Sequence, residues 1–145
     1  MDWELRRRLL AELERAHASE GPAAGARIAL GQAAEGAPKL WTVRQALRVR
    51  CDRRAALAPG ASYDPLAASG PASDHVVAFA RGGEVVTVVP RLVLGLGRRG
   101  GWGETTLELP PGRWRDALTG AHAGGRSRVA ELLGGFPVAL LVRED

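Results

Sequence analysis

Few residues in this chain of 145 residues combine the types and the spacing that catalysis requires. Ser73, Asp74 and His75 supply the three side-chain types of a nucleophilic triad. Neighbours in an extended segment point to opposite faces, however, so they cannot form a relay. We therefore interpret this tripeptide as a turn.

Metal ligands are equally sparse. His17, His75 and His122 lie far apart, and none has a second histidine, cysteine or carboxylate at a ligand spacing such as HxxxH. A single cysteine, Cys51, can form neither an internal disulfide nor a CxxC site. We expect no metal site and no cofactor.

Several acidic residues could supply the carboxylate pair that acid/base catalysis needs, but nothing in their spacing selects two of them. Salt bridges and solvated faces explain them sufficiently. These residues are Asp64, Asp74, Glu104, Glu108 and Asp116.

The segment 95–100 matches the pattern GxGxxG. In a dinucleotide site the glycines open a helix whose N-terminus holds the pyrophosphate. Here Gly101, Trp102 and Gly103 follow, and then a strand pattern begins. We predict a flexible hairpin loop at this place.

The tryptophans divide into core and surface candidates. Trp114 alternates on a strand and should be core, whereas Trp102 lies between glycines and should be exposed, where it could touch a ligand or a neighbouring domain. Trp41 and Arg44 could line a partner surface or form an ordinary helix interface.

The net charge of +4 and the pI near 10.5 raise the question of nucleic acid. Residues 1–54 hold 11 basic and 7 acidic side chains, and residues 55–145 hold 9 of each. All cationic side chains except Lys39 are arginine. Together with the abundant Ala, Gly and Pro, this indicates a compositional bias of the source genome and not selection for nucleic-acid binding. We expect no nucleic-acid partner.

No membrane partner is expected either. The longest apolar run, 136–142, is far shorter than the roughly 18–20 residues that cross a bilayer. The first residues lack the apolar region of a secretory signal, so a cytoplasmic location is expected.

Helical periodicity dominates the first part of the chain. An amphipathic helix capped by Asp2 is predicted over 2–17, a short and weak one over 26–34, and a third from Pro38 to about 54. The apolar face of the third is predicted to consist of Leu40, Val43, Leu47 and Cys51, with Ala46 beside it.

After residue 60 the pattern changes to short strands bounded by Gly, Pro or Asp. Gly82 and Gly83 indicate a tight hairpin, and Pro90 ends its second strand or places it at an edge. The fold class is therefore α+β: two or three N-terminal helices over 1–56, then an antiparallel β-sandwich over 57–145. The predicted strands are 63–67, 75–81, 84–90, 105–109, 113–118 and 137–143.

Four strings then carry a family resemblance: PKLWTVRQALRVR at 38–50, HVVAFARGGEVVTVVPRL at 75–92, GGWGETTLELPPGRWRDALTG at 100–120 and ELLGGFPVALLVR at 131–143. In their order and spacing they resemble the C-terminal end of maltooligosyltrehalose synthase, in the α-amylase superfamily of glycoside hydrolases. The similarity extends from about Asp2 to Arg143.

The resemblance implies an isomerase of trehalose biosynthesis, which turns the reducing-end α-1,4 linkage of a maltooligosaccharide into an α,α-1,1 linkage. In that superfamily a (β/α)8 barrel of about 250 residues carries the catalytic carboxylates, and an antiparallel sandwich follows it. The segment 39–54 would be the last barrel helix and 61–145 the sandwich. No catalytic residue is therefore expected in this chain, which should be inactive alone.

The same resemblance implies partners. The first expected partner is the catalytic barrel, if it is separately present. In its absence Leu40, Val43 and Leu47 would need another surface to cover them. They could instead be buried against the sandwich, against helix 2–17 or in a homodimer. Maltooligosaccharide is the second expected partner, with Lys39, Trp41 and Trp102 as candidate contacts.

The start inside the family's pattern predicts a fragment, a truncated product or a separately encoded piece. The alternative is a detached binding or interaction module that uses the Arg44/Arg48 face or the 95–103 loop.

Overall fold

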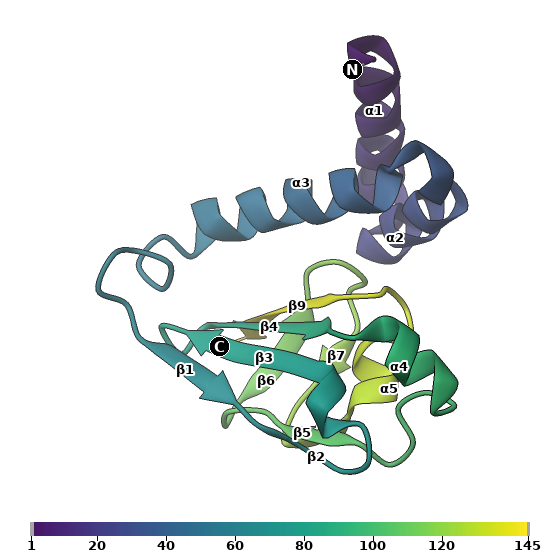
Figure 1. Ribbon diagram of the computed structural model, residues 1–145. Helices are drawn as coiled ribbons and strands as arrows, with labels where there is room; N and C mark the ends of the chain where they lie inside the picture. Colours follow the sequence, from purple (N-terminus) through teal and green to yellow (C-terminus); the bar gives the residue numbers. More distant parts are fainter. Residues whose placement is uncertain (1, 145) are drawn as a thin grey trace.

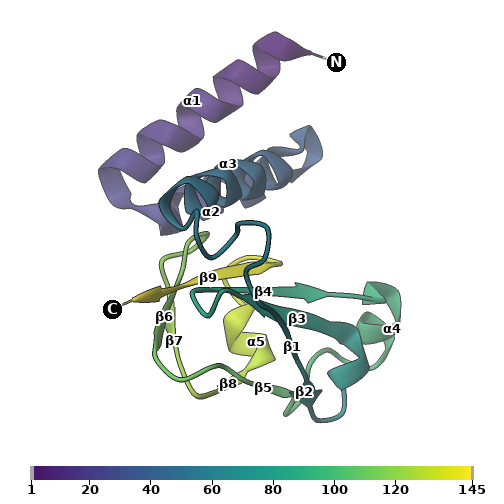
Figure 2. The ribbon, with the colours of Figure 1, turned by 90° about the vertical axis from the view of Figure 1, so that its left-hand side faces the viewer.

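Three helices precede the strands and gather on one side of the β part in the computed structural model, which describes residues 2–144. They are α1 (Trp3–Glu20), α2 (Pro22–Gly31) and α3 (Ala37–Asp52), with a 3₁₀ turn at Ala33–Glu35 between the last two. Figures 1 and 2 show α3 lying across the six-stranded sheet, above β4 and β9. Within residues 2–144, no helix is long and apolar enough to span a bilayer.

The helix starts follow local sequence signals. The Asp2 carboxylate accepts a hydrogen bond of 2.9 Å from the backbone N–H of Leu5, which confirms the predicted cap. Pro22 and Pro38 lie in the first turns of α2 and α3. The prediction of a weak helix over 26–34 was wrong in its boundaries, because Pro22 starts α2 earlier and Gln32 ends it.

All six predicted strands are present: β1 (Tyr63–Leu66), β3 (Val76–Arg81), β4 (Val85–Pro90), β5 (Thr106–Glu108), β6 (Arg113–Asp116) and β9 (Ala139–Glu144). The sequence did not indicate three further strands, which are β2 (Ala68–Ser69), β7 (His122–Ala123) and β8 (Arg126–Arg128). β2 and β7 have two residues each, which is too short for an alternating pattern to be recognised, and β8 contains only Arg-Ser-Arg and no apolar residue.

The strands form two antiparallel sheets, in the orders β1-β3-β4-β9-β6-β7 and β2-β5-β8. Gly82 and Gly83, with φ of 54° and 68°, make the predicted hairpin between β3 and β4. Residues of both sheets, such as Val88, Leu107 and Leu141, meet in one apolar cluster. The α+β class with antiparallel sheets is confirmed.

The segment 95–100 corrects one prediction. It is not a hairpin loop, because Val93–Arg98 form a short α-helix, α4. The residue before this helix, Leu92, has a left-handed backbone conformation. A second short helix, α5 (Val129–Leu132), also interrupts the β part. The segment Ser73–His75 is a 3₁₀ turn, as its interpretation as a turn requires.

The apolar face predicted for α3 does not lie toward the β part. Val43 and Leu47 are 46% and 56% exposed, and the face toward the β part instead carries Trp41, Gln45 and Val49. Periodicity detects an apolar stripe, but it does not say which neighbour covers that stripe. Three covers were proposed for this face: the β part, helix 2–17 and a second copy of the chain. Neither the sheet nor α1 covers Val43 or Leu47.

Trp41 is the centre of the cluster that joins helices to sheet. It is fully buried together with Leu9 and Leu13 of α1 and with Leu118 and Phe136 of the β part. A Cβ atom at Gly25 of α2 would lie 2.5 Å from the indole of Trp41. The helical layer and the β part therefore share one close-packed core.

We predict that Gly25→Ala lowers the free energy of unfolding by about 1–3 kcal/mol, because the added methyl overpacks this cluster. Gly31→Ala in the same helix is the matched control, since a Cβ atom added there would have no neighbour within 4 Å. Alanine should stabilise that position by up to about 1 kcal/mol. Urea unfolding followed by circular dichroism checks both, and equal effects of the two substitutions would contradict the packing argument.

Candidate functional site

A cleft of about 470 Å³ lies where the end of α1 and the inner face of α3 meet strands β6 and β9. Charged side chains from α3, β6 and β9 line its wall, and α1 contributes His17. The lining includes His17, Arg48, Asp52, Arg53, Arg115 and Glu144.

The turn after β6 fixes the position of α3 above this cleft. The indole N–H of Trp41 donates to the carbonyl of Leu118 at 3.0 Å, and the side-chain amide of Gln45 donates to the carbonyl of Ala117. Gln45 is 5% exposed, so this bond satisfies a polar group that would otherwise be costly to bury.

Asp116 shapes that turn. Its carboxylate accepts hydrogen bonds from the backbone N–H groups of Leu118 and Leu140 and from the hydroxyl of Thr119, at 3.0, 3.1 and 2.7 Å. Burial raises the pKa of Asp116, and these hydrogen bonds oppose the rise because they favour the charged form. Its role is therefore structural.

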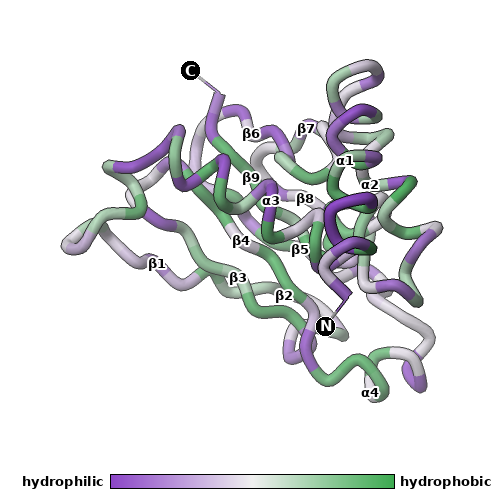
Figure 3. The backbone as a smooth tube through the Cα atoms, turned by 90° about the horizontal axis from the view of Figure 1, so that it is seen from above, coloured by the Kyte–Doolittle hydropathy of each residue, from purple (hydrophilic) through white to green (hydrophobic). Residues whose placement is uncertain are grey.

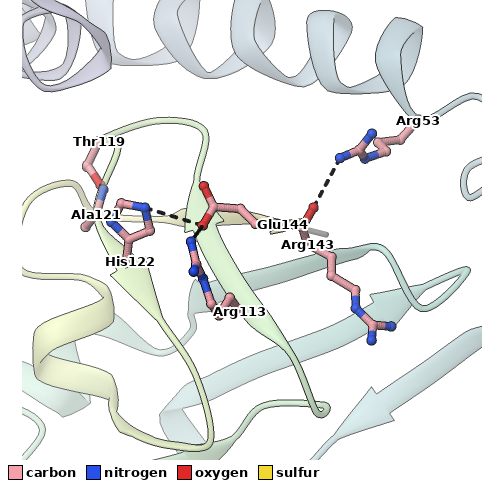
Figure 4. A network of polar contacts seen from close by, with 7 residues as sticks. All are labelled: Arg53, Arg113, Thr119, Ala121, His122, Arg143 and Glu144. Atoms are coloured by element: carbon pink, nitrogen blue, oxygen red, sulfur yellow. Dashed lines mark hydrogen bonds and ion pairs between the residues drawn. The ribbon is translucent and has the colours of Figure 1, made fainter.

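Strand register decides which arginines face the cleft. Arg115 is paired with Val142 and Arg113 with Glu144, and Val142 packs against Val49 of α3. Arg115 therefore lies on the α3 side of the sheet, whereas Arg143 lies on the other side. Figure 4 shows the Arg143 side chain pointing away from α3.

Ion pairs occupy the outer end of the cleft (Figure 4). Glu144 lies 3.4 Å from both Arg113 and His122. Arg53 lies 3.5 Å from Glu84 and also donates to the carbonyl of Arg143 at 3.1 Å. Arg53 therefore ties the end of α3 to the sheet, whereas the contacts of Glu144 join strands β6, β7 and β9.

His17 forms the inner wall. Its ring and that of Trp41 pack edge to face, with ring centroids 5.6 Å apart, and its Nδ1 atom is buried with no hydrogen-bond partner among residues 2–144. Burial lowers the pKa of His17 first, and the positive charges of Arg44, Arg48 and Arg115 lower it further. The inner cleft therefore concentrates positive potential.

The three residues proposed for sugar contact do not come together in one place. Lys39 is exposed in the first turn of α3, and Trp102 is half-buried against the core between the sheets. Trp41 is 0% exposed, so within this structure no sugar ring can stack on it. Arg44 is also engaged, since it lies over the Trp41 ring and contacts Glu14 and Gln45.

Carboxylates that could pair for catalysis are dispersed. Glu104 pairs with Arg128 at 2.7 Å, Glu108 with Arg126 at 3.7 Å, and Asp64 accepts from Ser62. Within residues 2–144 no three His, Cys, Asp or Glu side chains are grouped so that they could hold a metal ion. The sequence did not indicate the cleft, because its walls come from segments about 100 residues apart.

The fold and the cleft define an α+β domain in which a helical layer is hydrogen-bonded onto an antiparallel sheet. Two proteins from strains of Mycobacterium tuberculosis that are named maltooligosyl trehalose synthase are 44% identical over 108 residues, which is 74% of this chain and 14% of each relative. No protein-family model matches the chain.

Solved structures of a maltooligosyltrehalose synthase from Arthrobacter ramosus, one of them a mutant, match with a TM-score of 0.79 and 35% identity. The match covers 99% of this chain and 17% of the solved chain. The resemblance to the C-terminal region of maltooligosyltrehalose synthases is thereby confirmed. The chain spans about one seventh of the length of the curated relatives.

We predict that His17 makes the stability of the domain depend on pH. Because its folded pKa lies below the unfolded value of about 6.5, the unfolded state binds the proton first as the pH falls. Stability should be intact above that value and decrease as the pH falls toward the folded pKa.

His17→Gln should remove this decrease, whereas His122→Gln, at an exposed histidine, should keep it. Urea unfolding at several pH values between about 8 and 5, together with NMR titration of the His17 ring, checks the prediction. An NMR pKa of His17 at or above that of a free histidine would contradict it.

Proposed function

We propose that the chain is the C-terminal, non-catalytic part of a maltooligosyltrehalose synthase and supports the catalytic barrel of that enzyme. The observation that carries the proposal is the outer stripe of α3, which we define as Leu40, Val43, Leu47 and Cys51. Val43, Leu47 and Cys51 are exposed and Leu40 is half-buried. The relatives extend far beyond the matched part, so they contain chain that could cover such a stripe.

Burial on a second element would favour this arrangement energetically. Each large aliphatic side chain gains about 1.5–3 kcal/mol when it passes from full exposure to full burial. Because Val43 and Leu47 point away from the sheet, α3 can contact the sheet and the barrel at the same time. The stripe therefore suits a helix that lies between two layers.

In this proposal the catalytic carboxylates come from the barrel. Glu104 and Glu108 of the β part are engaged in ion pairs, and Asp116 is engaged in its own turn. A retaining glycosidase-type site needs two carboxyls about 5–5.5 Å apart on either side of the bond. Lys39 and Trp102 remain our candidates for contact with maltooligosaccharide, because each keeps exposed surface.

A second candidate function is a detached interaction module. The observation in its favour is the apolar end of the β part, where Leu92, Val93 and Leu94 are 61%, 58% and 79% exposed. Figure 3 shows the hydrophobic residues of α4 at this projecting corner, remote from α3. The two candidates therefore use different surfaces.

We predict that the chain alone makes no non-reducing, trehalose-type product from maltopentaose, and that adding a separately made barrel fragment restores this activity. Val43→Asp should weaken the restoration about tenfold or more, because it places a charge in the buried interface. Val93→Asp is the matched control, with the same change at a residue of similar exposure, and should restore activity like the unmodified chain.

Activity of the chain alone would contradict the proposal. Absence of activity in both the chain alone and the mixture would favour the interaction module. Loss of restoration by Val93→Asp in place of Val43→Asp would move the barrel contact from the stripe to α4 and contradict the role of the stripe. Light scattering on the same variants tests whether a second copy of the chain covers the stripe instead. A dimer that Val43→Asp dissociates would show that the stripe binds a second copy and not the barrel.

A further inference from the structure

The inner cleft holds two arginines that the fold itself does not use. Arg48 of α3 and Arg115 of β6 both line it. Neither side chain has an ion-pair or hydrogen-bond partner within the described range 2–144, although other arginines of the same region do. Both residues are solvent-exposed, so their guanidinium groups are accessible.

These two charges are held close to like charges. Arg44, also on α3, is fixed by Glu14 and by the Trp41 ring, and Arg53 is fixed by Glu84. Guanidinium groups around one cleft repel each other, and this repulsion is relieved when an anion enters. Glu144 also lines the cleft, but it already forms an ion pair with Arg113 at 3.4 Å.

The buried Nδ1 atom of His17 is a second, independent feature. It has no partner among the described residues, and buried polar atoms without partners are rare in folded proteins. His17 lines the same cleft. The negative charge of a bound oxyanion would therefore stabilise the protonated ring, and the protonated ring would in turn attract the anion. Trp41, Arg44, Arg48 and Arg115 are the groups that face the ring.

We propose that this cleft is a binding site for a phosphate-type oxyanion, with Arg48 and Arg115 as its donors and His17 at its inner wall. Guanidinium groups present planar, charged donors that suit the oxygens of such an anion. A volume of about 470 Å³ accommodates phosphate or a small phosphate ester. Asp52 also lines the cleft and repels an anion, so it limits the affinity.

The experiment is a titration of the 145-residue chain with inorganic phosphate at constant ionic strength, with chloride as the reference salt. Calorimetry gives the affinity, and NMR reports which amides shift. Arg48→Gln and Arg115→Gln should each weaken binding about tenfold, since each removes a charged donor. Asp52→Asn should strengthen binding severalfold, because it removes a like charge from the cleft.

Arg50→Gln is the matched control. It lies on the same helix and changes the net charge equally, but it faces away from the cleft. Its affinity for phosphate should equal that of the unmodified chain. The pKa of His17 should rise when phosphate is added, and this rise should be absent in Arg48→Gln. Absence of binding at tens of millimolar phosphate, or equal weakening by Arg50→Gln and Arg48→Gln, would overturn the proposal.

Discussion

The turn after β6 is the constraint on which the rest of the structure depends. Asp116 gathers three donors, two from its own turn and one from Leu140 at the start of β9. Because the carboxylate holds this turn, the carbonyls of Ala117 and Leu118 point at α3 and accept from Gln45 and Trp41. A buried acid in the β part thereby sets the place of a helix more than 60 residues earlier in the chain.

Two consequences follow for α3. The indole of Trp41 must enter a core shared with α1 and α2, and Gly25 leaves the room for it. The same rotation of the helix directs Arg48 toward the sheet and Val43 and Leu47 toward solvent. The basic cleft and the outer stripe therefore result from one choice of helix orientation.

Local signals were enough to predict much of the fold from the sequence. The cap at Asp2, Pro38 in a first turn and the Gly82–Gly83 hairpin each act over a few residues, and all six predicted strands are present. The orientation of α3 depends on hydrogen bonds to residues 117 and 118, which no local pattern contains. The sequence therefore indicated an apolar stripe but not the surface that covers it, and Gln45 on the inner face was not recognised.

The cleft was beyond sequence reasoning for a related reason. Its arginines are separated by 67 positions, from Arg48 to Arg115, and they meet because the β6–β9 register places Arg115 on the side of the sheet that α3 covers. A helix fixed on one face by hydrogen bonds keeps its other face in a constant orientation. For that reason the outer stripe is preorganised for a partner, and binding there need not spend free energy on ordering α3. A partner on the stripe and an anion in the cleft would therefore act on opposite faces of the same rigid helix, without competing for the same side chains.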